Sequence, residues 1–117
     1  MNSPVTRKVE EQLGLIIDDA ARSWLSERLI EPRTTTLHWE YGKDEAFPAW
    51  IVGEVGTAGG RKIVIAYCEG GHGALGAPWG LIFADDEYFG MDCSWYEDLA
   101  TLVRDERPSE VTGGAAL

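Results

Sequence analysis

The first thirty residues carry the hydrophobic pattern of a helix. Apolar side chains recur at three- and four-residue spacing, and most charged residues fall between them. Pro4 suits the first turn of a helix, Gly14 predicts a bend or a break, and Pro32 makes continuation beyond Ile30 unfavourable. The predicted buried stripe comprises Val9, Leu13, Ile16, Ile17, Ala20, Ala21, Trp24, Leu25 and Leu29.

The middle of the chain changes to the two-residue alternation of β-strands. Strands are predicted at 34–41, 47–55, 62–68 and 79–84, with a short fifth strand at 88–91. The segment 62–68 is apolar at successive positions, which is typical of a central strand that is covered on both faces. The short turns between the strands favour antiparallel neighbours.

The pattern returns to a helix near the C-terminus. Ser94 followed by Glu97 matches the capping box, and Pro108 ends the helix. The fold class is therefore predicted to be α+β: an antiparallel four- to five-stranded meander sheet with an N-terminal and a C-terminal helix packed on it. We expect a single domain over residues 1–107 and a flexible tail over 108–117.

The charge distribution restricts the choice of partners. The chain has 20 acidic and 10 basic residues, which gives a formal net charge of −10. There is no Lys or Arg from Ile63 to Val103, whereas this stretch holds many of the acids. Such a field attracts basic proteins, and it repels nucleic acids and anionic membranes. With no apolar run of membrane-span length and a polar N-terminus, we expect a cytoplasmic protein that binds neither nucleic acid nor membrane.

The acidic turn after the fourth predicted strand is the leading candidate for a binding surface. Acids there are interleaved with aromatic residues, and aromatic side chains supply binding energy while acids supply steering. The alternative is that the acids are merely solvated and that several of the aromatics belong to the core. The predicted partner-binding residues are Asp85, Asp86, Glu87, Tyr88, Phe89, Asp92, His72 and Trp79.

His72 and Trp79 join this set through the glycine-rich stretch 70–80. A phosphate-binding loop would need a Gly-Lys-Ser/Thr ending and a helix directly after it, and the sequence has neither. The stretch is therefore interpreted as a connection between two strands. We expect it to present His72 and Trp79 to a protein partner.

Cysteine chemistry provides an alternative hypothesis. Cys68 and His72 are the only local pair of nucleophile and base, and no third residue is evident to orient them. Together with Cys93 and His38 they have the residue types of a zinc site, but the spacing is unlike one. We therefore expect no catalytic residue, metal or cofactor. A small enzyme or ligand-binding domain that uses Cys68 and His72 stays the alternative, as does a subunit of a larger assembly.

The run from Ile63 to Val103 combines a strand, Cys-Glu-Gly-Gly, Pro-Trp-Gly, a second strand, an acidic turn and Ser-Trp-Tyr-Glu. With its small size, acidity and α+β pattern, the chain resembles the immunity proteins of bacterial toxin–immunity systems. This resemblance implies a cytoplasmic inhibitor that binds a cognate toxin, often a basic nuclease, and blocks its active site. Small acidic phage-encoded inhibitors of bacterial defence have a similar appearance and are a second interpretation.

Overall fold

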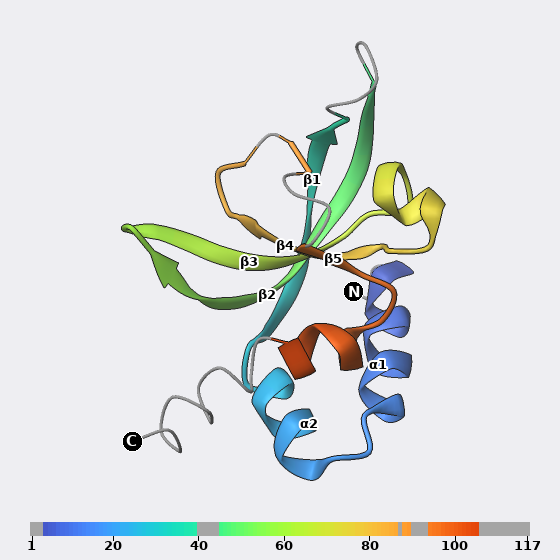
Figure 1. Cartoon of the computed structure of the whole chain (residues 1–117), viewed down its shortest axis with the longest axis vertical. Coiled ribbons are helices and arrows are strands. Elements are labelled where there is room, and N and C mark those ends of the chain that lie inside the picture. Colours follow the sequence, from blue (N-terminus) through green and yellow to red (C-terminus); the bar gives the residue numbers. More distant parts are fainter. Residues whose placement is uncertain (1–3, 40–44, 87, 90–93, 106–117) are drawn as a thin grey trace.

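The chain folds as a five-stranded antiparallel sheet with helices at both ends (Figure 1). The structure, a computed structural model, describes residues 4–39, 45–86, 88–89 and 94–105. Its elements are α1 (Pro4–Leu15), α2 (Asp19–Ser26), β1 (Leu29–His38), β2 (Ala46–Ala58), β3 (Arg61–Tyr67), the 3-10 turn η1 (Gly71–Leu75), β4 (Trp79–Phe83) and β5 (Trp95–Tyr96), and residues 99–105 are helical. The strands neighbour one another in chain order, so the predicted α+β meander is confirmed.

The N-terminal helical pattern is divided into two helices. The first helix ends at Leu15, and Asp18 caps the second, because its Oδ2 accepts a hydrogen bond from the Ala21 N–H at 3.0 Å. The break next to Gly14 confirms the predicted interruption. The break also leaves Ile17 in solvent, 93% exposed, so the expectation that Ile17 is buried is wrong. Leu29 begins β1 instead of ending the helix.

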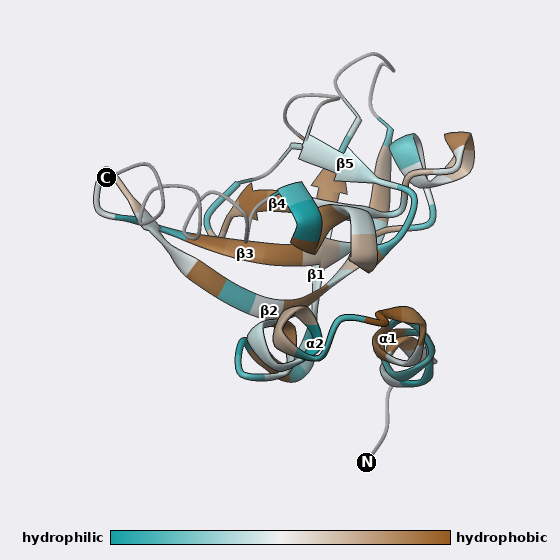
Figure 2. Cartoon of the chain, turned by 60° about the horizontal axis from the view of Figure 1, so that its bottom comes forward, coloured by the Kyte–Doolittle hydropathy of each residue, from teal (hydrophilic) through white to brown (hydrophobic). Residues whose placement is uncertain are grey.

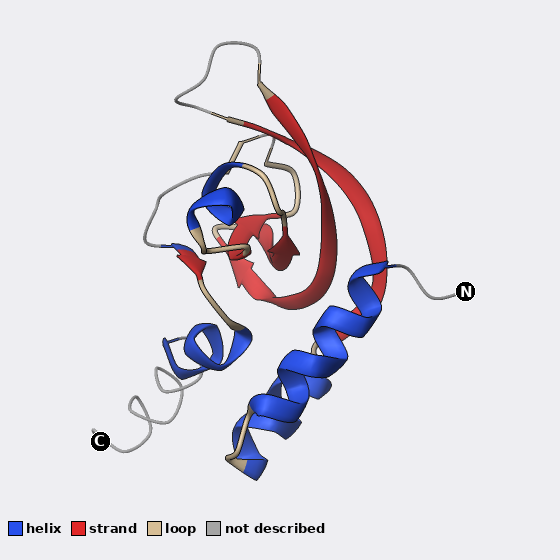
Figure 3. Ribbon diagram, turned by 90° about the vertical axis from the view of Figure 1, so that its right-hand side faces the viewer, coloured by secondary structure: helices blue, strands red, loops and turns tan. Residues whose placement is uncertain are grey.

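Two apolar layers lie on opposite faces of the sheet. One face packs against α1, α2 and the helix at 99–105, and Figure 2 shows α1 and α2 beneath the sheet. The other face packs against the segment around Phe89 and Trp95, while the strands curve around η1 (Figure 3). The central strand β3 supplies Ile65 to the first layer and Val64 to the second. This confirms that its continuous apolar run is buried on both faces.

The C-terminal helix begins later than the capping box predicts. Asp98 provides the cap, since its Oδ1 accepts a hydrogen bond from the Thr101 N–H at 2.7 Å. The predicted start at Ser94 is therefore wrong, and Glu97 lies before the helix. The first helical residue is tied to α1, because the Leu99 N–H donates to the side-chain oxygen of Gln12 at 2.9 Å.

A short strand occupies the place of the predicted first turn of that helix. Trp95 pairs with Gly80 of β4, and a Cβ on Gly80 would come within 2.5 Å of the Trp95 indole. The indole N–H donates to the Phe89 carbonyl at 2.6 Å. The fifth strand was predicted at 88–91, where Tyr88 forms only an isolated parallel bridge with His38 and residues 90–91 lie outside the described residues.

Candidate protein-binding surface

The acidic turn after β4 is held by a cation from β3. Arg61 donates to the carboxylate oxygens of Asp85 at 2.8 Å and of Asp86 at 3.1 Å, and its guanidinium lies 3.9 Å from the centre of the Phe83 ring. The Asp86 carboxylate also accepts the Phe83 N–H at 3.0 Å. The hydrogen bond from Arg61 lowers the pKa of Asp85. The turn therefore neutralises part of its own charge; Glu87 and Asp92 lie outside the described residues.

Two of the aromatic residues predicted to bind a partner belong to the core. Phe89 is fully buried and Trp79 is 2% exposed, so the expectation that they lie on the surface is wrong. Phe89 packs edge-on against Trp95, and Trp79 packs against the Tyr67 ring with centroids 4.5 Å apart. Tyr88 differs from its neighbour, because it is 52% exposed; its ring is tilted against that of His38, with centroids 5.6 Å apart.

The glycine-rich stretch turns His72 inward, while Leu75 at the end of η1 is 79% exposed. Only 6% of His72 is exposed, and its ring lies against Trp39, with centroids 4.9 Å apart, and against Phe89. The glycines are explained by close approach. Gly71 has a φ of +55° and leaves no room for a Cβ next to Phe89, and a Cβ on Gly73 would collide with the chain at the end of β3. His72 is therefore a core residue of the turn that closes this layer.

The environment of Cys68 suppresses thiolate chemistry. The side chain is fully buried, and its Sγ donates to the Pro48 carbonyl at 3.4 Å. Burial raises the pKa of the Cys68 thiol, whereas a nucleophilic cysteine needs a lowered one. Among the described residues no group of three His, Cys, Asp or Glu side chains could hold a metal ion, and Cys93 lies outside them. The geometry therefore does not favour the alternative that uses Cys68 and His72.

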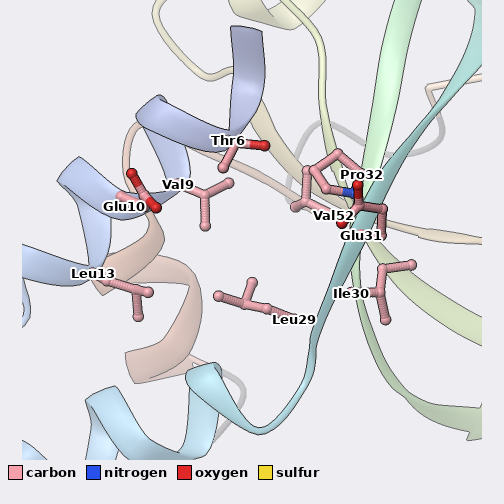
Figure 4. A pocket seen from close by; sticks show the side chains of 9 residues that line it. All are labelled: Thr6, Val9, Glu10, Leu13, Leu29, Ile30, Glu31, Pro32 and Val52. Atoms are coloured by element: carbon pink, nitrogen blue, oxygen red, sulfur yellow. The ribbon is translucent and has the colours of Figure 1, made fainter. Parts of the chain in front are cut away.

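A surface groove that the sequence pattern does not reveal lies between α1 and the start of β1 (Figure 4). Its volume is about 340 Å³. It is produced by a bulge in β1: Leu29 pairs with Gly53 and Arg33 with Ile51, so three residues of β1 face Val52 alone. The lining is mostly apolar and comprises Val9, Leu13, Leu29, Ile30, Pro32 and Val52, with Thr6, Glu10 and Glu31 as its polar members.

The two carboxylates of the groove come from opposite walls, Glu10 from α1 and Glu31 from the bulge (Figure 4). Both residues are exposed, and within the described residues neither carboxylate has an ion-pair partner. Glu69, by contrast, pairs with Lys8 at 3.7 Å and Glu54 with Lys62 at 3.3 Å. Negative charge that the described cations do not neutralise therefore borders an apolar groove.

Within the described part of the chain, no helix has the length and apolar character needed to cross a membrane. Comparisons with protein-family models, with curated proteins and with solved structures find no match to this chain.

Proposed function

We propose that this chain is an inhibitory binding protein of the immunity type, which neutralises a basic toxin or nuclease by covering its active site. The observation that supports the proposal is the groove between α1 and β1, where an apolar lining adjoins the carboxylates of Glu10 and Glu31. An apolar lining supplies contact that excludes water, and carboxylates without internal partners are available to Lys or Arg of another protein.

Apolar contact in the groove would supply most of the binding free energy, and charge would act mainly on the rate of association. Burial of one Leu- or Phe-sized side chain in the groove would contribute about 1.5–3 kcal/mol. The net charge of −10 would act mainly on the rate of association, because a field of one sign steers an oppositely charged partner. That contribution falls as salt is added, since the screening length is about 8 Å at physiological ionic strength.

The acidic turn takes a smaller part in this proposal. Asp85 and Asp86 already share the guanidinium of Arg61, so a partner cation would have to compete with an existing ion pair. We assign them to the long-range field, and we assign the direct contact to Glu10 and Glu31. A phage-type inhibitor of a bacterial defence protein would use the same groove and the same charges.

The test is co-expression with the product of the neighbouring gene. We expect that product to arrest growth when it is expressed alone, and we expect this chain to restore growth and to bind the purified product with an association rate that falls with salt. The double variant Glu10→Lys/Glu31→Lys should lose protection. The matched control Asp85→Ser/Asp86→Ser should keep it. A wild-type chain that neither protects nor binds the neighbouring product contradicts the proposal.

A further inference from the structure

The outer edge of β1 is a second feature of the same side of the fold. β1 is the first strand in the sheet order and pairs with β2 on one side only. In the described residues, the sole contact of strand type on its other side is the bridge from His38 to Tyr88. An edge strand exposes a row of backbone N–H and C=O groups that another strand can pair with.

The register shows which backbone groups turn outward. The Trp39 N–H donates to the Glu45 carbonyl at 2.9 Å, so this position faces β2. Thr36 lies opposite Pro48, which has no N–H to donate. Because neighbouring residues of an antiparallel strand alternate between the two sides, the backbone groups of Thr34 and Thr36 point away from β2. His38 lies two residues after Thr36, so its backbone groups point to the same outer side, where it forms the bridge with Tyr88.

Among the residues that the structure describes, strand-pairing protection of this edge lies at its two ends. The bulge and Pro32 stand before the open segment, and the bridge to Tyr88 covers its far end. These are common devices against unwanted strand pairing. Between them lie Arg33, whose charge also discourages pairing, and then three threonines, which favour strands and carry no charge. As far as the described residues show, the middle of the edge is therefore open to an added strand.

We propose that the basic partner binds by strand addition: an extended segment of it pairs with Thr34 and Thr36 and continues along β1 into the groove. The inference rests on the proposed function and specifies how the partner binds. The groove residues of β1 directly precede the open edge. At about 3.3 Å per residue, a segment of roughly six residues spans both features. It would place one apolar side chain in the groove and a Lys or Arg next to Glu31 or Glu10.

Charge selects a basic partner over a second copy of this chain. Pairing two copies through β1 would bring together two chains of net charge −10, each with Glu31 beside the contact. Like charges oppose such a contact, whereas a Lys- or Arg-bearing segment would neutralise the carboxylates on both walls of the groove. The occupant is therefore an extended basic segment with an apolar anchor.

The experiment uses hydrogen exchange measured by NMR on the full chain. The probes are a capped six-residue peptide of alternating lysine and valine, the same peptide with glutamate for lysine, and the lysine peptide with alternate backbone nitrogens methylated. In the free protein, the Thr34 and Thr36 amides should exchange faster than those of Thr35 and Leu37. With the lysine peptide at about ten times its Kd, exchange at Thr34 and Thr36 should slow about tenfold. Neither control peptide should produce this change.

Substitutions provide an independent measurement. Thr36→Pro removes an outward N–H that β2 does not use, and it should weaken the lysine peptide about five- to tenfold. The control Thr36→Val keeps the N–H and should stay within about twofold. Glu10→Gln/Glu31→Gln should weaken binding and reduce its salt dependence.

Equal binding of the lysine and glutamate peptides would overturn the inference. So would unchanged exchange at Thr34 and Thr36, or protection that rises with protein concentration in the absence of peptide, which would identify a second copy. The growth assay separates the two proposals. A Thr36→Pro chain that binds the purified neighbouring product with an unchanged Kd, and still protects cells, refutes strand addition and leaves the inhibitor function intact. Peptide binding by a chain that protects against no neighbouring product leaves the strand site intact and refutes the function.

Discussion

Replacement of Phe89 by alanine tests the assignment of this residue to the core. Phe89 is fully buried, and its ring contacts the rings of Trp39 and Trp95 at centroid distances of 5.3 Å and that of Phe47 at 6.1 Å. Removal of such a ring costs about 3–5 kcal/mol, because the apolar contact is lost and a cavity stays behind. A domain of this size is stable by roughly 6–15 kcal/mol, so Phe89→Ala should remove a large fraction of its stability.

The adjacent residue is the matched control. Tyr88 is half exposed and contacts the ring of His38, so Tyr88→Ala should change the free energy of unfolding by less than about 1 kcal/mol. The assay is urea unfolding monitored by tryptophan fluorescence. An unchanged dependence of the free energy of unfolding on urea concentration shows that unfolding stays two-state. A loss below about 1 kcal/mol for Phe89→Ala, or a larger loss for Tyr88→Ala, would refute the burial argument.

Three further predictions follow from the core and the acidic turn. Arg61→Gln should raise the pKa of Asp85 toward its ordinary range, measured by NMR titration; since the folded pKa is lowered, the stabilisation is present at neutral pH and should be lost as the pH falls through that pKa. A thiol reagent should leave Cys68 unmodified in the native protein and should modify it in urea; rapid native modification would contradict its burial and raised pKa. Gly73→Ala should prevent folding through its backbone collision, whereas Gly14→Ala meets nothing within 4 Å and should stabilise α1 by about 0.5–1 kcal/mol, both measured by thermal unfolding.

Local patterns predict the parts of the fold whose periodicity agrees with the tertiary structure. The run of apolar residues in β3 identifies a central strand, because only a strand covered on both faces tolerates such a run in water. Trp95 shows where this reasoning fails. Ser94 and Glu97 have capping-box spacing, but the indole of Trp95 packs on Gly80, which is distant in sequence, and this contact selects a strand.

The candidate site was harder to predict, because its features arise from contacts between distant segments. Phe89 and Tyr88 are adjacent aromatics in the sequence, and only the folded chain shows that one is buried and the other exposed. The groove depends on a bulge in β1, whose extra residues are visible only after the register with Val52 and its neighbours is known. The extra residues of a bulge interrupt the two-residue alternation without adding a pattern of their own, so the sequence does not indicate where the bulge lies.

The position of free negative charge follows from pairing between strands and helices more than from acid density along the chain. The stretch without Lys or Arg looks the most acidic, yet Lys8 and Arg61 from outside it pair with Glu69, Asp85 and Asp86 inside it. The carboxylates that border the groove have no such cation among the described residues. Within the part of the chain that the structure describes, a basic partner in direct contact would therefore find unpaired carboxylates beside α1 and β1, next to the edge of β1 that no described strand covers beyond the bridge at His38.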